Sequence, residues 1–183
     1  HRDMEIISIP LEGDLEHQDS TGTKGVIEKG EIQVMSAGKG VQHSEYNHSK
    51  DKEVKFLQIW VFPRELGIEP RGEQMSVKDG EVRNEFQQII SPNQDDAGLW
   101  IHQDAWFNLA KFDKGVAKEY KIHKDGNGIY AFVIKGSAKI GGQELNSRDG
   151  LGIWDVDGFE VEALDDAEFL LMEVPMDLPE YLR

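Results

Sequence analysis

His43 and Glu45 are the residues whose types and spacing best suit metal chemistry in this sequence. They lie two positions apart in GKGVQHSEYN, residues 38–47. On a β-strand, two such residues point to the same face, about 6.5–7 Å apart, while Ser44 points away. Imidazole and carboxylate ligands together suit Fe(II), Mn, Ni, Co or Zn, and a second histidine would still leave positions open for substrate or dioxygen. His1 is the candidate for that second histidine.

The spacing alone does not require a metal. A His-x-Glu pair in an acidic protein is more often a solvated pair of surface side chains. His17 could orient a metal ligand, but a hydrogen-bonded turn histidine is the more common case, and we expect it here. Phe56, Trp60 and Phe62 alternate along one apolar run and could line a cavity, although such a pattern is more typical of core residues.

The composition excludes several classes of protein. The 183 residues carry a formal charge of −15, from 35 acidic and 20 basic residues, so nucleic acids and anionic membranes are not expected partners. The absence of cysteine removes thiolate ligands and thiol nucleophiles, and it weakly favours a cytoplasmic location. No apolar run approaches the roughly 20 residues that a membrane-spanning helix needs.

Short apolar runs separated by glycine and charged residues predict an all-β fold of the sandwich or barrel type. Helical patterns are confined to residues 82–90 and a short piece at 176–183. Residues 69–94 are the least strand-like part of the chain, and we expect the boundary between two halves there. The apolar runs are EIISIPLEG, GEIQVMSAG, VKFLQIWVFP, GIYAFVIKG, GLGIWDVDG and AEFLLMEVP.

The two halves resemble weak copies of one another. Gly13 and Gly136 each follow an apolar run, and the pairs Gly30/Gly38 and Gly150/Gly158 share a separation of eight residues. This spacing suggests a duplicated β unit.

The glycine spacing also predicts what the second half holds in place of the ligands. It aligns His43 with Ala163 and Glu45 with Asp165, and no histidine falls in register. We therefore expect the second half to be free of metal.

Several longer motifs resemble the pirin family, and bacterial pirins in particular. The resemblance covers most of the chain and implies two tandem cupin-type (jelly-roll) β-barrels with few short helices. Residues 1–75 would be the metal-binding N-terminal barrel, incomplete at its start, and residues 76–183 a degenerate C-terminal barrel. The motifs are HRDMEI, LEGDLEHQDS, QVMSAGKGVQHSEYN, LQIWVFP, EPRGEQ, SPNQDDAGLWIHQDA and GLGIWD.

The resemblance also implies a ligand set. Pirins hold one metal, usually iron, through three histidines and one glutamate. Carried over to this sequence, the ligands are His1, His43 and Glu45, and the family's first histidine would lie two residues before His1. We expect Fe(II), with Mn, Ni, Co, Cu or Zn as alternatives, and we expect Glu5 to be structural.

Two functions follow from the resemblance. The first is a quercetin 2,3-dioxygenase activity, in which Glu45 acts as the catalytic base toward a flavonol and O2 cleaves the heterocyclic ring. The second is a non-enzymatic, metal-binding and redox-sensitive regulatory role through a protein partner, as proposed for eukaryotic pirins. An acidic surface is compatible with such a partner.

Overall fold

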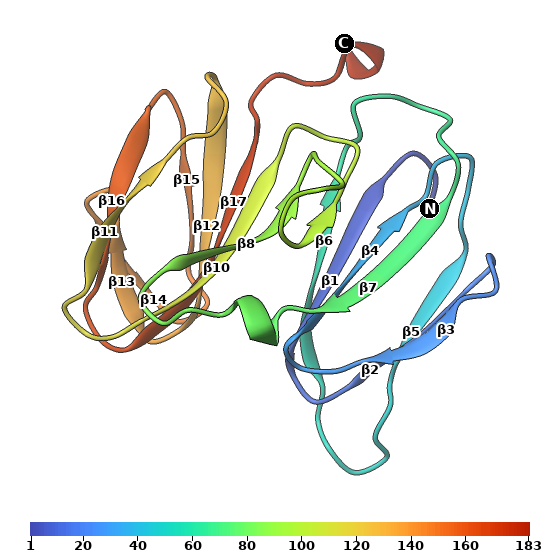
Figure 1. Ribbon diagram of the computed structural model, residues 1–183, viewed down its shortest axis with the longest axis horizontal. Coiled ribbons are helices and arrows are strands. Elements are labelled where there is room, and N and C mark those ends of the chain that lie inside the picture. Colours follow the sequence, from blue (N-terminus) through green and yellow to red (C-terminus); the bar gives the residue numbers. More distant parts are fainter. The chain divides into compact units, whose positions relative to one another are not determined.

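The computed structural model describes residues 1–183 and consists almost entirely of β-strands joined by short turns (Figure 1). The helical elements are two short 3-10 helices, η1 (Lys78–Gly80) and η2 (Glu180–Leu182), so the prediction of an all-β fold is confirmed. The predicted helix over residues 82–90 is wrong, because strand β8 (Phe86–Ser91) occupies that segment. No helix is long and apolar enough to cross a membrane.

The chain divides into two compact units. Unit 1 contains residues 1–79, 93–103 and 179–183, and unit 2 contains residues 80–92 and 104–178. Residues 93–103 and 179–183 thus belong with the N-terminal part of the chain although they come later in the sequence.

Unit 1 is built from two antiparallel sheets (Figure 1). One sheet has the strand order β6-β1-β4-β7 and the other has the order β3-β2-β5. The first sheet contains β1 (Glu5–Glu12), β4 (Glu31–Ser36), β6 (Lys55–Val61) and β7 (Arg71–Ser76). The second contains β2 (Leu15–Asp19), β3 (Lys24–Ile27) and β5 (His43–Asn47), and the short strand β9 (Leu99–Trp100) also lies in unit 1.

Unit 2 is built in the same way. Its first sheet includes the order β15-β12-β17-β10-β8, and its second sheet has the order β11-β16-β13-β14. The strands of the first are β10 (Trp106–Phe112), β12 (Asn127–Lys135), β15 (Gly150–Ile153) and β17 (Ala167–Pro175), together with β8. Those of the second are β11 (Ala117–Lys121), β13 (Ser137–Ile140), β14 (Gln143–Asn146) and β16 (Gly158–Ala163).

Side-chain alternation explains how these strands close over a core. In β16, Phe159, Val161 and Ala163 are buried, whereas Glu160 between them is exposed. Strand side chains alternate between the two faces of a sheet, so one face of β16 is apolar and the other meets water. The buried faces of unit 2 form one apolar cluster.

The strand order confirms the internal repeat. The neighbours β4-β1-β6 of unit 1 recur as β15-β12-β17 in unit 2, and β3-β2-β5 recur as β14-β13-β16. Gly13 and Gly136 end the first strand of each copy with φ of +72° and +75°. A Cβ atom would lie 2.4 Å from the carbonyl oxygen of Glu53 at Gly13 and 2.0 Å from that of Asp166 at Gly136. Both turns therefore require glycine for the same two reasons, conformation and space.

The pairing registers fix which residues of the two units are equivalent. Aligning Gly13 with Gly136 equates Leu15 with Ala138. Leu15 pairs with Asn47, and Ala138 pairs with Ala163. Asn47 therefore corresponds to Ala163.

This register corrects the alignment expected from glycine spacing. His43 corresponds to Phe159 and Glu45 to Val161, rather than to Ala163 and Asp165. The alignment by glycine spacing is displaced by four residues. The β15–β16 connection (154–157) is two residues shorter than the β4–β5 connection (37–42), and Gly30 precedes β4 whereas Gly150 already lies in β15, so these two glycines are not equivalent. Strand pairing, unlike glycine spacing, is unaffected by loop length.

Candidate metal centre

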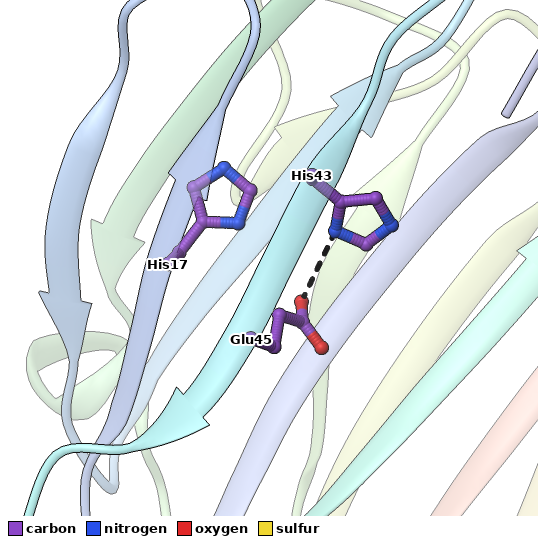
Figure 2. Close-up of side chains that lie close together, drawn as sticks. All are labelled: His17, His43 and Glu45. Carbon is purple, nitrogen blue, oxygen red and sulfur yellow. Dashed lines mark ion pairs between the residues drawn. The ribbon is translucent and has the colours of Figure 1, made fainter.

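Three side chains from two neighbouring strands of unit 1 converge (Figure 2). His17 on β2 lies directly opposite Glu45 on β5, and Asp19 lies opposite His43. Directly paired residues share a face of the sheet, as do residues two apart on one strand. One ligand atom from each of His17, His43 and Glu45 therefore lies within 4.8 Å of the others.

Each histidine of this cluster has a buried ring nitrogen without a hydrogen-bond partner, as a metal site requires. His17 is 1% exposed, and the side chains of His43 and Glu45 are 8% and 7% exposed. The Nδ1 atoms of His17 and His43 are buried without a hydrogen-bond partner. A buried polar atom without a partner costs free energy, so two such atoms beside a carboxylate fit a bound divalent metal.

Asp19 sets the orientation of His17. Burial raises the pKa of Asp19, but hydrogen bonds with His17, Thr21 and Thr23 outweigh burial and lower the pKa below its usual value. The resulting carboxylate accepts a hydrogen bond from His17 Nε2 at 2.7 Å. In the imidazole tautomer that carries its proton on Nε2, the Nδ1 lone pair is free to bind a metal.

Burial favours the neutral form of His43. Burial lowers its pKa below the ordinary value, and this effect exceeds the opposing attraction of Glu45. Its Nδ1 atom lies 3.9 Å from Glu45 Oε1, which is too far for a hydrogen bond (Figure 2). The nitrogen is therefore available to an ion placed between the two side chains.

Glu45 is held from the opposite sheet of unit 1. The Ser8 hydroxyl on β1 donates to Glu45 Oε1 at 2.8 Å, and the Gln58 amide on β6 donates to Oε2 at 2.6 Å. Both carboxylate oxygens thus have a donor, and the two hydrogen bonds join the two sheets of the unit.

His1 lies beside this cluster. Its ring centroid is 4.8 Å from that of His43 and 4.7 Å from that of Trp60, and its carbonyl oxygen accepts a hydrogen bond from Val41 N. The group of converging ligand atoms contains His17 and does not include His1. The structure thus brings together two of the three residues predicted from sequence, places the third next to them and adds His17.

The interpretation of His17 as a turn histidine is wrong, because it lies in the middle of β2. The overlooked signal is the alternation of His17 and Asp19, which matches that of His43 and Glu45 on the strand with which β2 pairs. The interpretation of the aromatic residues as core is also wrong. Phe56, Trp60 and Phe62 are 37%, 56% and 45% exposed.

Glu5 is buried away from the cluster. It accepts hydrogen bonds from the Ser36 hydroxyl at 2.7 Å and pairs with His102 Nδ1 at 3.2 Å. Glu5 and Ser8 are separated by an odd number of positions on β1 and so face opposite sides of the sheet. The expected structural role of Glu5 agrees with this position.

The equivalent positions in unit 2 have no atoms that could bind a metal. His17, His43 and Glu45 correspond to Ile140, Phe159 and Val161. The donor pair Ser8 and Gln58 corresponds to Ala131 and Leu171, which are paired in the same way. All five of these unit 2 side chains belong to its apolar cluster.

Comparison with known proteins identifies the family. The family model described as Pirin matches residues 1–61, and the model described as Quercetinase C-terminal cupin domain matches residues 88–174. A protein of Escherichia coli K12 named quercetin 2,3-dioxygenase is 38% identical over 175 residues, which cover 96% of this chain and 74% of the relative. The chain belongs to the pirin family. A pirin-like protein of Caulobacter vibrioides is 37% identical over 174 residues, covering 94% of this chain and 74% of the relative.

Solved pirin structures share the fold. The crystal structure of YhhW from E. coli superposes with a TM-score of 0.89 at 38% identity, covering 96% of this chain and 73% of that protein. The predicted fold of two cupin-type barrels is therefore confirmed. A second structure of the bacterial pirin YhhW, in complex with nickel(II), has a TM-score of 0.88 at the same identity and covers 96% of this chain and 74% of that protein.

Proposed function

We propose that this pirin is a metal-dependent dioxygenase of the quercetin 2,3-dioxygenase type, which cleaves flavonol-like substrates with O2. The observation that carries the proposal is the pair of buried, unpartnered histidine nitrogens beside Glu45. The name of the E. coli relative supports the choice of substrate class.

His17, His43 and Glu45 would hold the metal, and His1 would be a further ligand from its position beside His43. Nitrogen and carboxylate donors suit Fe(II), which we propose as the physiological ion, and also Mn, Co, Ni, Cu or Zn. The nickel complex of YhhW supports binding of a divalent first-row metal. When bound, the metal would supply Lewis acidity and a centre for reaction with O2.

The residues of the chain would bind and deprotonate the substrate. Trp60 lies on the site-facing side of β6, and Phe62 directly follows the end of this strand. Their exposed aromatic rings offer a planar substrate a surface for stacking. Glu45 would accept the proton of the flavonol 3-hydroxyl, and it would later return that proton to the product. Both atoms of O2 enter the product and one ring carbon leaves as carbon monoxide, so the reaction needs no external reductant.

The test is O2 uptake by the iron-loaded protein with quercetin, measured together with metal content. Glu45→Gln should reduce turnover more than metal content, because an amide still offers an oxygen ligand but is a poor base. His43→Ala should abolish both, whereas His48→Ala serves as a control because that ring is half exposed and outside the cluster.

Two results would redirect the assignment. A metal-loaded protein without flavonol-dependent O2 uptake above free iron would contradict the dioxygenase and favour the regulatory role through a protein partner. Equal loss of metal and turnover in Glu45→Gln would leave Glu45 as a ligand only.

A further inference from the structure

A chain of hydrogen bonds runs from the exposed Trp60 side chain to the proposed metal ligand Glu45. The Trp60 indole Nε1–H donates to Gln58 Oε1 at 3.0 Å, and Gln58 Nε2 donates to Glu45 Oε2 at 2.6 Å. Trp60 and Gln58 lie two apart on β6, and Gln58 is paired with Ser8, the second donor to Glu45. All these side chains therefore share the site-facing side of the sheet.

The indole of Trp60 fixes the donor-to-acceptor direction of these hydrogen bonds. A tryptophan side chain can only donate, so Gln58 must present its carbonyl oxygen to Trp60. The amide NH2 group of Gln58 then faces Glu45, where it can donate and cannot accept. Trp60 thereby removes the ambiguity that an amide otherwise has between its two orientations.

The two oxygens of Glu45 consequently have different surroundings. Oε1 is the oxygen 3.9 Å from His43 Nδ1 (Figure 2). Oε2 accepts the hydrogen bond from Gln58. The Gln58 hydrogen bond opposes rotation of the carboxylate about its last bond. It favours a state in which Oε1 alone is directed toward the histidines.

We propose that Gln58, oriented by Trp60, is a positioning residue that makes Glu45 a one-oxygen ligand. This inference rests on the proposed metal site and does not depend on the identity of the substrate. A carboxylate that uses one oxygen leaves a coordination position open for substrate or dioxygen, which a two-oxygen ligand would occupy.

Unit 2 provides an internal comparison. In the same strand register, Gln58 corresponds to Leu171 and Trp60 to Glu173. Unit 2, which has apolar residues at the positions of His17, His43 and Glu45, therefore also lacks both members of the hydrogen-bond chain. The Gln-x-Trp arrangement thus occurs together with the histidine cluster and is not required by the barrel fold itself.

Cobalt(II) binding tests the proposal, because its visible absorption changes with coordination number and geometry. Gln58→Met keeps the length of the side chain and removes the donor. Outer-shell partners of metal ligands typically contribute 10–100-fold in affinity, so Gln58→Met should weaken Co(II) binding about tenfold and alter the spectrum. Trp60→Phe keeps an aromatic ring but loses the N–H, and it should weaken binding about threefold.

The two substitutions should not act independently. Trp60 acts only through Gln58, so the double variant should bind Co(II) about as tightly as Gln58→Met alone. Gln18→Met is the matched control, since Gln18 is exposed on β2 between His17 and Asp19 and points to the other face. It should leave the affinity and the spectrum unchanged.

Three outcomes would overturn the inference. The first is wild-type affinity and spectrum in Gln58→Met, and the second is a double variant whose losses multiply. The third, failure of the wild-type protein to bind Co(II), would overturn the metal site as well. The Co(II) experiment does not depend on flavonol turnover. A protein that binds Co(II) as expected but does not turn over a flavonol would therefore contradict the dioxygenase activity and still support the role of Gln58.

Discussion

His17 lies directly opposite Glu45 in the antiparallel pairing of β2 with β5. This pairing places an imidazole with a free, buried nitrogen beside a carboxylate that is held by two donors from the other sheet. His17 therefore joins the cluster through its cross-strand partner, which lies 28 positions further along the sequence.

We predict that His17→Ala weakens divalent metal binding by about a hundredfold, because it removes a nitrogen ligand from the cluster. Isothermal titration or competition with a chromophoric chelator would measure the loss. His48→Ala provides the control, since it removes a histidine from unit 1 outside the cluster. Unchanged affinity in His17→Ala would show that His17 only fills space beside the ligands.

The apolar runs of the sequence correctly predicted six of the seventeen strands, β1, β4, β6, β12, β15 and β17, and their repetition in two similar halves. Short β-branched and aromatic runs between glycines identify strands without reference to their partners. Strand β7 was missed because most of its residues are exposed, so its pairing with β4 leaves no alternating apolar pattern. The prediction of a helix over residues 82–90 was wrong for a related reason, because an apolar pattern in so short a segment fits both the period of a helix and that of a strand.

The site was only partly predictable for a different physical reason. His43 and Glu45 share a strand, and their geometry follows from the period of two. The contributions of His17 and Gln58 depend on which strands pair and in what register. A one-residue change in either register would turn these side chains to the opposite face, and nothing local in the sequence fixes it.

Two turn glycines of unit 2, Gly136 and Gly115, allow the energetic cost of a positive φ to be separated from the cost of steric crowding. Gly136→Ala should destabilise the protein by about 3 kcal/mol, because alanine at positive φ is strained and its Cβ would meet the Asp166 carbonyl. Gly115 has a φ of +87° with nothing near the Cβ position, so Gly115→Ala should cost only about 1 kcal/mol. Urea unfolding measures both. Equal costs would show that the crowding at Gly136 is relieved by a small backbone shift.

A buried carboxylate ties down the turn before β12 in unit 2. Glu173 accepts hydrogen bonds from Tyr120 OH at 2.9 Å, from Asn127 Nδ2 at 2.8 Å and from the backbone N–H of His123 at 3.0 Å, and pairs with His123 Nδ1 at 2.8 Å. Burial raises the pKa of Glu173, but these hydrogen bonds, led by those of His123, outweigh it and lower the pKa below the ordinary value.

This lowered pKa predicts a dependence of stability on pH. The contribution of Glu173 is complete above its ordinary value of 4.5 and is lost as the pH falls through the lower folded-state value. Glu173→Gln should therefore cost about 2 kcal/mol at about pH 6, and the difference from wild type should shrink toward about pH 3. Chemical unfolding at several pH values measures it, with the half-buried Glu168→Gln on β17 as the control. A difference that stays constant with pH would contradict the ionised role of Glu173.

The comparison between units finally predicts that the metal site lowers the stability of the metal-free protein. Ser8 and Glu45 correspond to Ala131 and Val161, which belong to the apolar cluster of unit 2. Replacement of buried charged groups by apolar ones is often stabilising by about 1–4 kcal/mol. The double variant Ser8→Ala/Glu45→Val should thus unfold at a higher urea concentration than wild type in the presence of a chelator, and it should lose metal binding.

The single variant Glu45→Val serves as the matched control for this prediction. It leaves the buried Ser8 hydroxyl without its acceptor, which costs about 1–2 kcal/mol, so the single variant should be less stable than the double. Added metal should raise the stability of wild type alone, because only that protein binds it in the folded state. A double variant less stable than metal-free wild type would show that the Ser8–Glu45 hydrogen bond stabilises unit 1 even without a metal.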